Sequence, residues 1–405
     1  MNQKSVMLIA GEASGDAVAA ELVRTLADAL PQAAETDEVQ PMTSSLRPRF
    51  FGAGGPKMAE AGVELAFDMT RQSAIGLSDV LKKLPVFERM FRQLLAMAKE
   101  RQPDLIVLVD FGGFNRRFAH AIRKMVRASQ SVFFNWSPKI VQYVSPQVWA
   151  SRPGRGAKLA KDINLLLCLF PFEKQWYAQH VPQLRVECVG HPLFDRHAAA
   201  GFRFPVPRGL EQNTEEPSIV LLPGSRTAEL RRHLPEMVGA VQRISAQAKA
   251  HFTMVLPNDA LLTQALTFGT DAIPNLKLQI GGLSSALARA TLAIASTGTV
   301  TLECAYFAVP TVAIYKTSWS TYEIARRIIK VRFLAMPNLL ADEVLFPELI
   351  QHDATAEKIA RESLALLGNP NRRQEIQAKL QSIMTSLGGP GAGQRAARAI
   401  ASLFQ

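Results

Sequence analysis

The residues best suited to chemistry follow an apolar segment near the middle of the chain. The run 219–222 precedes Gly224, Ser225 and Arg226, after which a helical pattern begins. Glycine lets a backbone approach a ligand closely, N–H groups at a helix start favour an anion, and arginine can hold two phosphate oxygens at once. The spacing therefore predicts a diphosphate site. The alternative is that Ser225 only caps a helix and Arg226 is a solvated charge, and this loop alone does not choose between the two.

A second loop with the same organisation lies near residue 298. The residues Ser296, Thr297, Gly298 and Thr299 follow another apolar run, and Glu303 comes about one helical turn later. Hydroxyl groups and glycine can receive phosphate, whereas a carboxylate on the helix can hold ribose hydroxyls. Glu303 as a first-turn acid favoured by the helix dipole is the alternative. Because two such loops occur in one half of the chain, a bound nucleotide is favoured.

A third loop, GEASGD, directly follows the apolar run 6–10. It contains Glu12, Ser14 and Gly15, and its alternative interpretation is a turn capped by Ser14 or Asp16. The G-x-G-x-x-G spacing of dinucleotide sites is absent, as is the lysine of a Walker motif. The sequence therefore disfavours NAD and ATP as ligands.

Asp110 is the candidate for acid–base chemistry. It ends the strongly apolar run 105–109 and is followed by Gly112, Gly113 and Asn115. A buried unpaired carboxylate is costly, so an acid at the end of a strand is more often functional than structural. A salt-bridged or capping Asp110 is the alternative.

Other reactive side chains give weaker signals. Cys168, Cys188 and Cys304 form neither a disulfide framework nor a metal-ligand spacing, which fits a reducing cytoplasm. His191 follows a strand pattern and is as consistent with a hydrogen-bonded structural histidine as with a site residue. No pair of carboxylates demands a metal.

Length and composition restrict the kind of protein that carries these loops. A chain of 405 residues predicts two domains, and 48% hydrophobic with 20% charged residues is typical of a folded globular protein. The sequence has no apolar run of about 18 residues and no signal-peptide pattern. A formal net charge of +11 favours an anionic partner. Because no nucleic-acid motif is visible, we expect that partner to be a phosphorylated molecule or an acidic membrane.

The elements that must position these loops alternate between strands and helices. Such alternation predicts an α/β fold with parallel sheets and crossover helices, and the number of strands calls for two doubly wound sheets. The strand candidates are 6–10, 50–51, 104–110, 162–170, 185–190, 218–224, 251–257, 290–296 and 311–316. A segment rich in Pro, Gly and charge, 201–217, predicts the linker between two domains, 1–197 and 198–380. The polar, proline-flanked segment 31–48 is expected to be an exposed insertion.

Taken together, the motifs resemble the lipid-A-disaccharide synthase family in order and spacing. The similarity runs from Ala10 to about Gln351 and includes GEASGD, GPKMAEAG, LFPFEK, VGHPL and ASTGTVTLE, with YVSPQVWA, LLPGSR and PNLLA as the most specific set. Two positions depart from the family pattern. Ser151 stands where a second Trp is usual, and Gly113 stands where many members carry an Asp.

The resemblance implies a GT-B architecture, in which two Rossmann-like domains face each other across a cleft and a last helix, within 381–405, packs back on the first domain. It also implies inverting transfer from a UDP-2,3-diacylglucosamine donor to 2,3-diacylglucosamine 1-phosphate, giving a β-1′,6-linked disaccharide phosphate. No metal and no other cofactor is expected. The implied partners are these two substrates, the anionic inner membrane surface and a second copy of the chain in a homodimer, without nucleic acid.

The resemblance also assigns roles to residues. Asp110 matches the family's general base, Arg226 with the loop hydroxyls would stabilise the departing UDP, Glu303 would orient ribose and Asn338 would complete the cleft. The implied substrate-binding set is Glu12, Ser14, Gly15, Asn115, Gly224, Ser225, Arg226, Ser296, Thr297, Gly298, Thr299, Glu303 and Asn338.

Residues 77–101 carry apolar side chains at helical spacing with basic residues between them. This pattern predicts peripheral association with an anionic membrane. The resemblance implies that the protein is cytoplasmic and that this membrane is the inner face of the inner membrane. The alternative is a core-facing helix with a solvated side, and Pro85 is expected to break or kink the helix.

Two other functional classes stay open for the whole chain. One is another GT-B nucleotide-sugar enzyme, such as an epimerase or a soluble-acceptor transferase, and the other is a non-catalytic basic membrane-binding protein.

Overall fold

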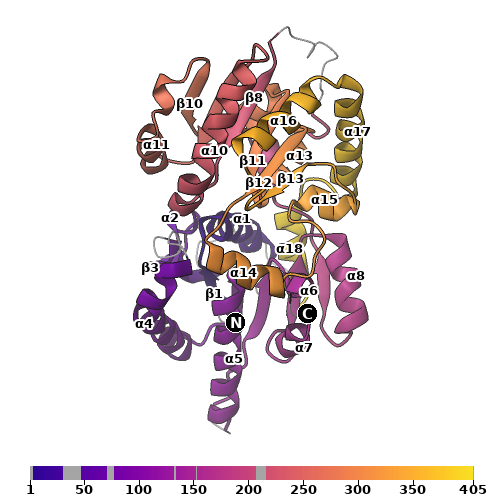
Figure 1. Cartoon of the computed structure of the whole chain (residues 1–405). Coiled ribbons are helices and arrows are strands. Elements are labelled where there is room, and N and C mark those ends of the chain that lie inside the picture. Colours follow the sequence, from indigo (N-terminus) through magenta and orange to yellow (C-terminus); the bar gives the residue numbers. More distant parts are fainter. Residues whose placement is uncertain are drawn as a thin grey trace. The chain divides into compact units, whose positions relative to one another are not determined.

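The computed structural model describes residues 3–30, 47–70, 77–131, 134–151, 153–206 and 216–404, with the backbone alone for 77–84, Ser320 and Ile324. The chain forms two α/β units, one of Met1–Asp195 with Gly389–Gln405 and one of Arg196–Gly388 (Figure 1). The first division falls inside helix α9 (Leu193–Ala199), close to the sequence-based boundary at 197, and the second lies after the expected 380. The insertion expected at 31–48 falls largely outside the described residues.

A parallel sheet forms the centre of the first unit, with strand order β3-β2-β1-β4-β5-β6-β7. Its strands are β1 (Ser5–Ala10), β2 (Arg49–Gly54), β3 (Glu64–Asp68), β4 (Leu105–Val109), β5 (Lys139–Tyr143), β6 (Leu165–Cys168) and β7 (Val186–Cys188). Every residue of β4 is completely buried. Helices cover both faces of a parallel sheet, which is why its central strands are continuous apolar runs.

Helices of the first unit follow the strands. They are α1 (Ala13–Ala29), α2 (Pro56–Glu60), α4 (Leu77–Arg101), α5 (Gly112–Ser129), α6 (Val148–Ser151), α7 (Arg155–Leu159), α8 (Pro171–His180) and α18 (Ala392–Ala401). Contrary to the expected break, α4 continues through Pro85. Its residues Met90, Leu94 and Ala98 are buried in the core, so this half of the helix is core-facing. The side chains of 77–84, on which the membrane prediction also rests, lie outside the described residues.

The second unit repeats the architecture with the strand order β10-β9-β8-β11-β12-β13. Its strands are β8 (Ser218–Leu222), β9 (His251–Leu256), β10 (Leu276–Ile280), β11 (Leu292–Ser296), β12 (Thr311–Tyr315) and β13 (Glu348–Ile350). Its helices are α10 (Thr227–Ser245), α11 (Asp259–Leu266), the short 3₁₀ helix η2 (Thr270–Ala272), α12 (Leu283–Arg289), α13 (Thr299–Tyr306), α14 (Trp319–Ile328), α15 (Met336–Ala341), α16 (Ala356–Leu367) and α17 (Pro370–Ser386). The prediction of two parallel doubly wound sheets is confirmed.

Helix α18 belongs to the first unit although it follows the second unit in the chain. It packs against α1, where the Thr25 hydroxyl donates to the carbonyl of Gly393 at 3.1 Å. The Asp195 carboxylate accepts the backbone N–H groups of Gly391 and Ala392 and thereby caps α18. Within the described ranges, every helix is too short or too polar to span a membrane.

Candidate functional site

Except for Asn338, the site residues predicted from the sequence lie in or beside loops at the carboxyl edges of the two sheets. The strand order reverses between β1 and β4 in the first unit and between β8 and β11 in the second. Ligands of open parallel sheets bind at such reversals, outside the carboxyl ends of the strands. The loops 11–16 and 110–115 flank the first reversal, and the loops 223–226 and 296–299 flank the second.

A strained turn carries Asp110. The φ angles of Asp110 and Phe111 are +50° and +45°, in the left-handed region that residues with side chains rarely adopt. Such a residue costs of order 1–3 kcal/mol and persists where its surroundings enforce it. Asn115 Nδ2 donates to the carbonyls of Val109 at 3.2 Å and Asp110 at 2.8 Å, and Gln142 Nε2 donates to the latter at 3.1 Å. Because Asn115 is fully buried, it holds this turn from inside, whereas the sequence analysis placed it against the substrate.

Two glycines allow the first loop to approach this turn. A Cβ on Gly11 would lie 2.4 Å from the aromatic ring that follows Asp110, so the position requires glycine. A Cβ on Gly15 would lie 3.6 Å from the Cβ of Asp110. Glu12 occupies the N-cap position of α1 and is partly buried, and Ser14 is exposed in the first turn of this helix. The structure therefore brings the loop that contains Glu12, Ser14 and Gly15 beside Asp110.

The last residue of GEASGD has a structural role that the sequence does not reveal. Asp16 is buried, and its carboxylate accepts the backbone N–H groups of Gly55, Lys57 and Met58 at 2.8, 3.0 and 3.1 Å. It therefore caps helix α2 and ties the GPKM segment to the first loop. A Cβ on Gly55 would lie 2.7 Å from this carboxylate, which explains the glycine that begins GPKM.

A second buried carboxylate organises the loop after β5. Glu173 accepts the indole N–H of Trp149 at 3.1 Å and the backbone N–H groups of Leu169 and Phe170 at 3.3 and 3.2 Å. Burial raises the pKa of Glu173 to about 7, and these hydrogen bonds oppose the rise. The motifs YVSPQVWA and LFPFEK are thus joined into one structural unit, a link that their separate positions in the sequence do not show.

In the second unit, Glu229 shapes the loop after β8. Gly224 has a φ of +122°, and a Cβ there would lie 2.6 Å from the Glu229 carboxylate. The same carboxylate accepts the N–H of Ser225 at 3.1 Å and pairs with the Arg226 guanidinium at 3.3 Å. This ion pair is solvent-exposed and therefore weak, so a phosphate can compete for the guanidinium. Gly224, Ser225 and Arg226 together place backbone N–H groups and a cation at the start of α10.

His233 fixes the same loop from inside the unit. Its Nδ1–H donates to the carbonyl of Pro223 at 2.7 Å, and its Nε2 accepts the backbone N–H of Lys316 at 2.9 Å. Burial lowers the pKa of His233, which favours this neutral tautomer. The histidine thus ties the loop after β8 to the end of β12, a role that the sequence-based set did not include.

The loop after β11 offers the start of another helix. Ser296 is buried at the end of the strand, whereas Gly298 and Thr299 are exposed. Gly298 has a φ of +132°, a conformation that favours glycine, and Thr297 donates its N–H to the carbonyl of Ile314 at 2.9 Å. Within the described part of the chain α13 has no side-chain cap at this end, so its first N–H groups suit an anion.

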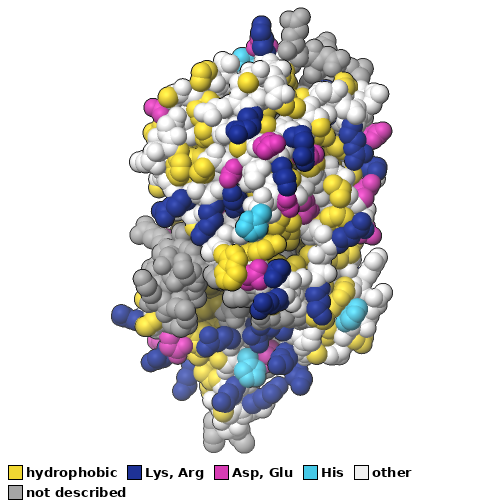
Figure 2. Space-filling view, in the orientation of Figure 1, with side chains coloured by type: hydrophobic (Ala, Val, Ile, Leu, Met, Phe, Trp, Pro, Cys, Tyr) yellow, Lys and Arg dark blue, Asp and Glu magenta, His cyan; other side chains and the backbone are white. Residues whose placement is uncertain are grey.

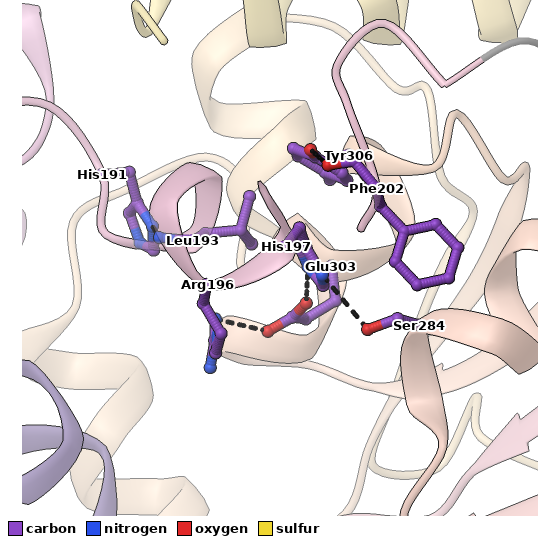
Figure 3. A network of polar contacts seen from close by, with 8 residues as sticks. All are labelled: His191, Leu193, Arg196, His197, Phe202, Ser284, Glu303 and Tyr306. Carbon is purple, nitrogen blue, oxygen red and sulfur yellow. Dashed lines mark hydrogen bonds and ion pairs between the residues drawn. The ribbon is translucent and has the colours of Figure 1, made fainter. Parts of the chain in front are cut away.

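Glu303 lies beyond the first turn of α13, and the interpretation as a first-turn acid is therefore wrong. Its carboxylate contacts Arg196 Nη2 at 2.7 Å and His197 Nε2 at 2.5 Å (Figure 3). The side chain is only 9% exposed. Glu303 is thus a carboxylate of α13 that two neighbouring side chains hold in place.

Asn338 lies deeper than the sequence analysis expects. It is fully buried, and its Nδ2 donates to the Phe346 carbonyl at 2.8 Å and to Glu348 at 2.9 Å. Its Oδ1 accepts the N–H groups of Leu345 and Phe346 at 2.9 and 2.8 Å. These bonds use the whole amide, so we assign Asn338 to holding the turn before β13 and not to a ligand-contacting surface.

Comparison with known proteins shows the family to which the chain belongs, over a range that includes the loops of both units. The family model described as lipid-A-disaccharide synthetase matches residues 6–402. The chain belongs to this family. It is 35% identical over 402 residues to the lipid-A-disaccharide synthase of Syntrophus aciditrophicus, covering 98% of this chain and 97% of that protein. Members of the lipid-A-disaccharide synthase family are glycosyltransferases, and the chain is accordingly a glycosyltransferase of lipid A synthesis.

Solved structures resemble the fold at low sequence identity. A putative UDP-N-acetylglucosamine 2-epimerase from Listeria monocytogenes aligns over 100% of this chain and 97% of its own, with a TM-score of 0.62 and 12% identity. The glycosyltransferase of kitacinnamycin aligns over 98% of each chain, with a TM-score of 0.56 and 17% identity. These similarities support the GT-B fold expected for the lipid-A-disaccharide synthase family.

The buried Glu173 predicts a change in how stability depends on pH. Because the folded protein raises the pKa of this carboxyl from 4.5 to about 7, it favours the protonated form, and that stabilisation is lost as the pH rises through about 7. The free energy of unfolding of the wild type, relative to Glu173→Gln, should therefore fall by about 2–3 kcal/mol from about pH 5 to about pH 8. Urea unfolding at both pH values measures this difference, and a difference that stays constant with pH contradicts the assignment.

Proposed function

We propose that the chain transfers 2,3-diacylglucosamine from UDP to the 6-hydroxyl of 2,3-diacylglucosamine 1-phosphate. The products are UDP and a β-1′,6-linked disaccharide phosphate, with inversion at the anomeric carbon. The observation that carries the proposal is the family match over residues 6–402. Loops suited to an anion and to a base, at the strand-order reversals of the two sheets, support it.

In this proposal the second unit binds the UDP of the donor. The N–H group of Gly224, the exposed Ser225 side chain, the exposed start of α13 and the Arg226 guanidinium are the groups that suit a diphosphate. Negative charge grows on the diphosphate as the bond to the sugar breaks, and these groups stabilise it. Glu303 holds the ribose hydroxyls.

The first unit supplies the general base. Asp110 takes the proton of the acceptor's 6-hydroxyl as that oxygen attacks the anomeric carbon of the donor. The oxygen–carbon bond forms while the bond between the sugar and UDP breaks, and the electron pair of that bond leaves with UDP. The rigid left-handed turn at Asp110 suits this role, because a base must be held within hydrogen-bond reach of its proton.

One assay separates the proposed reaction from its alternatives. Purified protein with UDP-diacylglucosamine should release UDP only when the diacylglucosamine phosphate is also present, and mass spectrometry should find the disaccharide phosphate. An epimerase would change the sugar without requiring the acceptor, a soluble-acceptor transferase would prefer an unacylated acceptor, and a non-catalytic membrane-binding protein would release nothing. Any of these three results refutes the proposed function.

Replacing Asp110 by Asn should remove most turnover and leave UDP affinity unchanged. Asn tolerates the left-handed backbone of this position but cannot accept the proton, so turnover should fall roughly a hundredfold to ten-thousandfold. Asp104→Asn is the matched control, because Asp104 precedes the other end of β4 and pairs with Lys4 at 3.3 Å. Near-normal turnover in a folded Asp110→Asn protein would move the search for the base to Glu12.

We also propose that the first unit binds an anionic membrane surface through the exposed basic residues of α4 and α5. Arg89 and Arg92 of α4 and Arg117 of α5 are exposed. The Arg117 guanidinium lies 5.8 Å from the ring centroid of Phe91, so the two helices contribute to one surface. Figure 2 shows Lys and Arg side chains gathered over this part of the first unit.

Neutralising this surface should weaken binding to vesicles that contain phosphatidylglycerol. Each basic residue near an anionic surface contributes about 1 kcal/mol, so three substitutions should reduce binding by about a hundredfold. The test variant changes three residues to Gln: Arg89, Arg92 and Arg117. The control variant changes three exposed basic residues of the second unit to Gln: Lys277, Arg361 and Lys379. Equal vesicle binding by the two variants would reject this surface.

A further inference from the structure

His197 is a buried histidine to which the proposed reaction gives no role. It lies in α9, directly after Arg196, and only 2% of it is exposed. Its Nε2 is 2.5 Å from an oxygen of Glu303, and its Nδ1 is 3.1 Å from the hydroxyl of Ser284 (Figure 3). Both ring nitrogens therefore have a polar partner within the second unit.

Aromatic side chains hold the imidazole ring of His197 in place. The ring centroids of Tyr306 and Phe307 lie 4.4 and 4.9 Å from that of His197. The Tyr306 hydroxyl in turn donates to the carbonyl of Phe202 at 3.0 Å. An imidazole enclosed in this way has little freedom to rotate, so the direction of its Nε2 is fixed.

Arg196 contacts the other oxygen of the same carboxylate. Its Nη2 lies 2.7 Å from Glu303 Oε1, and its side chain is 56% exposed, whereas that of Glu303 is 9% exposed. The two oxygens of Glu303 are thus held from two directions, by a buried donor and by a partly solvated one. Such contacts restrict the carboxylate to one orientation.

We propose that His197, supported by Ser284 and Arg196, is a positioning residue that orients Glu303 toward the ribose hydroxyls of the bound nucleotide. This inference rests on the proposed function, in which Glu303 holds ribose. What it adds is that recognition of the 2′,3′-diol by Glu303 depends on how His197 holds this carboxylate.

The chemistry of the three groups is consistent with this role. With a proton on Nε2, His197 donates to Glu303, and its Nδ1 lies within hydrogen-bond distance of the Ser284 hydroxyl. A carboxylate accepts hydrogen bonds from N–H and O–H groups. Ribose hydroxyls are such donors, and a 2′,3′-dideoxyribose lacks both of them.

The test compares the affinities of UDP and 2′,3′-dideoxy-UDP by calorimetry. The ratio of the two dissociation constants in the wild type measures how strongly the diol is recognised. The same ratio in Glu303→Ala gives the value that is expected when the diol is not recognised. His197→Phe keeps a ring in the aromatic surround but removes the donor, and it should reduce this preference by about tenfold or more. His197→Gln, which can still donate to the carboxylate, should restore most of the preference.

Tyr306→Phe is the structural control. It removes only the hydroxyl bond to Phe202 and keeps the ring against His197, so thermal stability should change without a change in the preference for UDP. If His197→Phe does not fold, Arg196→Gln and Ser284→Ala provide the same measurement, because Arg196 is exposed and Ser284 is partly buried. A loss of preference in those two variants supports the inference, and an unchanged preference overturns it.

The outcomes separate this inference from the function on which it rests. If the wild type binds no UDP, the proposed function fails together with the inference. If the wild type prefers UDP and folded His197→Phe keeps that preference, or loses affinity for both nucleotides equally, only the role of His197 fails.

Discussion

Parallel strands that are buried on both faces leave little room for polar side chains except at their ends. Strand β4 shows the constraint clearly, since all its residues are inaccessible and the polar Asp110 comes directly after it. The same constraint acts on β8, which is followed by the glycine loop of the second unit. Reversal of the strand order beside these two strands then sets which loops become neighbours. The candidate site therefore depends on sheet topology before it depends on any single side chain.

Acidic side chains hold these loops by accepting backbone N–H groups. Asp16 binds the start of α2, Glu173 binds the turn before α8, and Glu229 binds Ser225. Glu348 accepts the N–H groups of residues 334 and 335 in the same way. An acid in a loop motif of this fold is thus as often part of the scaffold as part of the chemistry. Glu303 is held instead by side chains, those of Arg196 and His197.

The sequence predicted most of the central strands correctly, but it missed β5 and several edge strands. Long apolar runs mark β1, β4, β8 and β11, because these strands are buried on both faces. Strands β3 and β10 lie at sheet edges and alternate between exposed and partly buried residues, so they lack that signal. Strand β13 has three residues, too few for any periodicity.

The loops of the candidate site were predictable from the sequence, but the contacts and the burial of their residues were not. Glycines directly after apolar runs identified the loops, since glycine weakens the interior of a strand. Pairings between distant residues gave no local signal, and for that reason the contacts of Glu303 with His197 and of Trp149 with Glu173 could not be predicted. The amides of Asn115 and Asn338 were placed against a ligand because the sequence does not show depth, and both are buried.

Helix α18 also determines when the first unit can be completed during synthesis. The ribosome produces β1 to β7 first, then the whole of the second unit, about 190 residues, and only then the segment Gly389–Gln405 that packs on α1. At translation rates of roughly 5–20 residues per second, the first unit waits about 10–40 seconds for its last helix. During this interval the face of α1 that α18 will cover stays open to other partners. The nascent first unit is therefore the stage at which this chain most needs protection from aggregation.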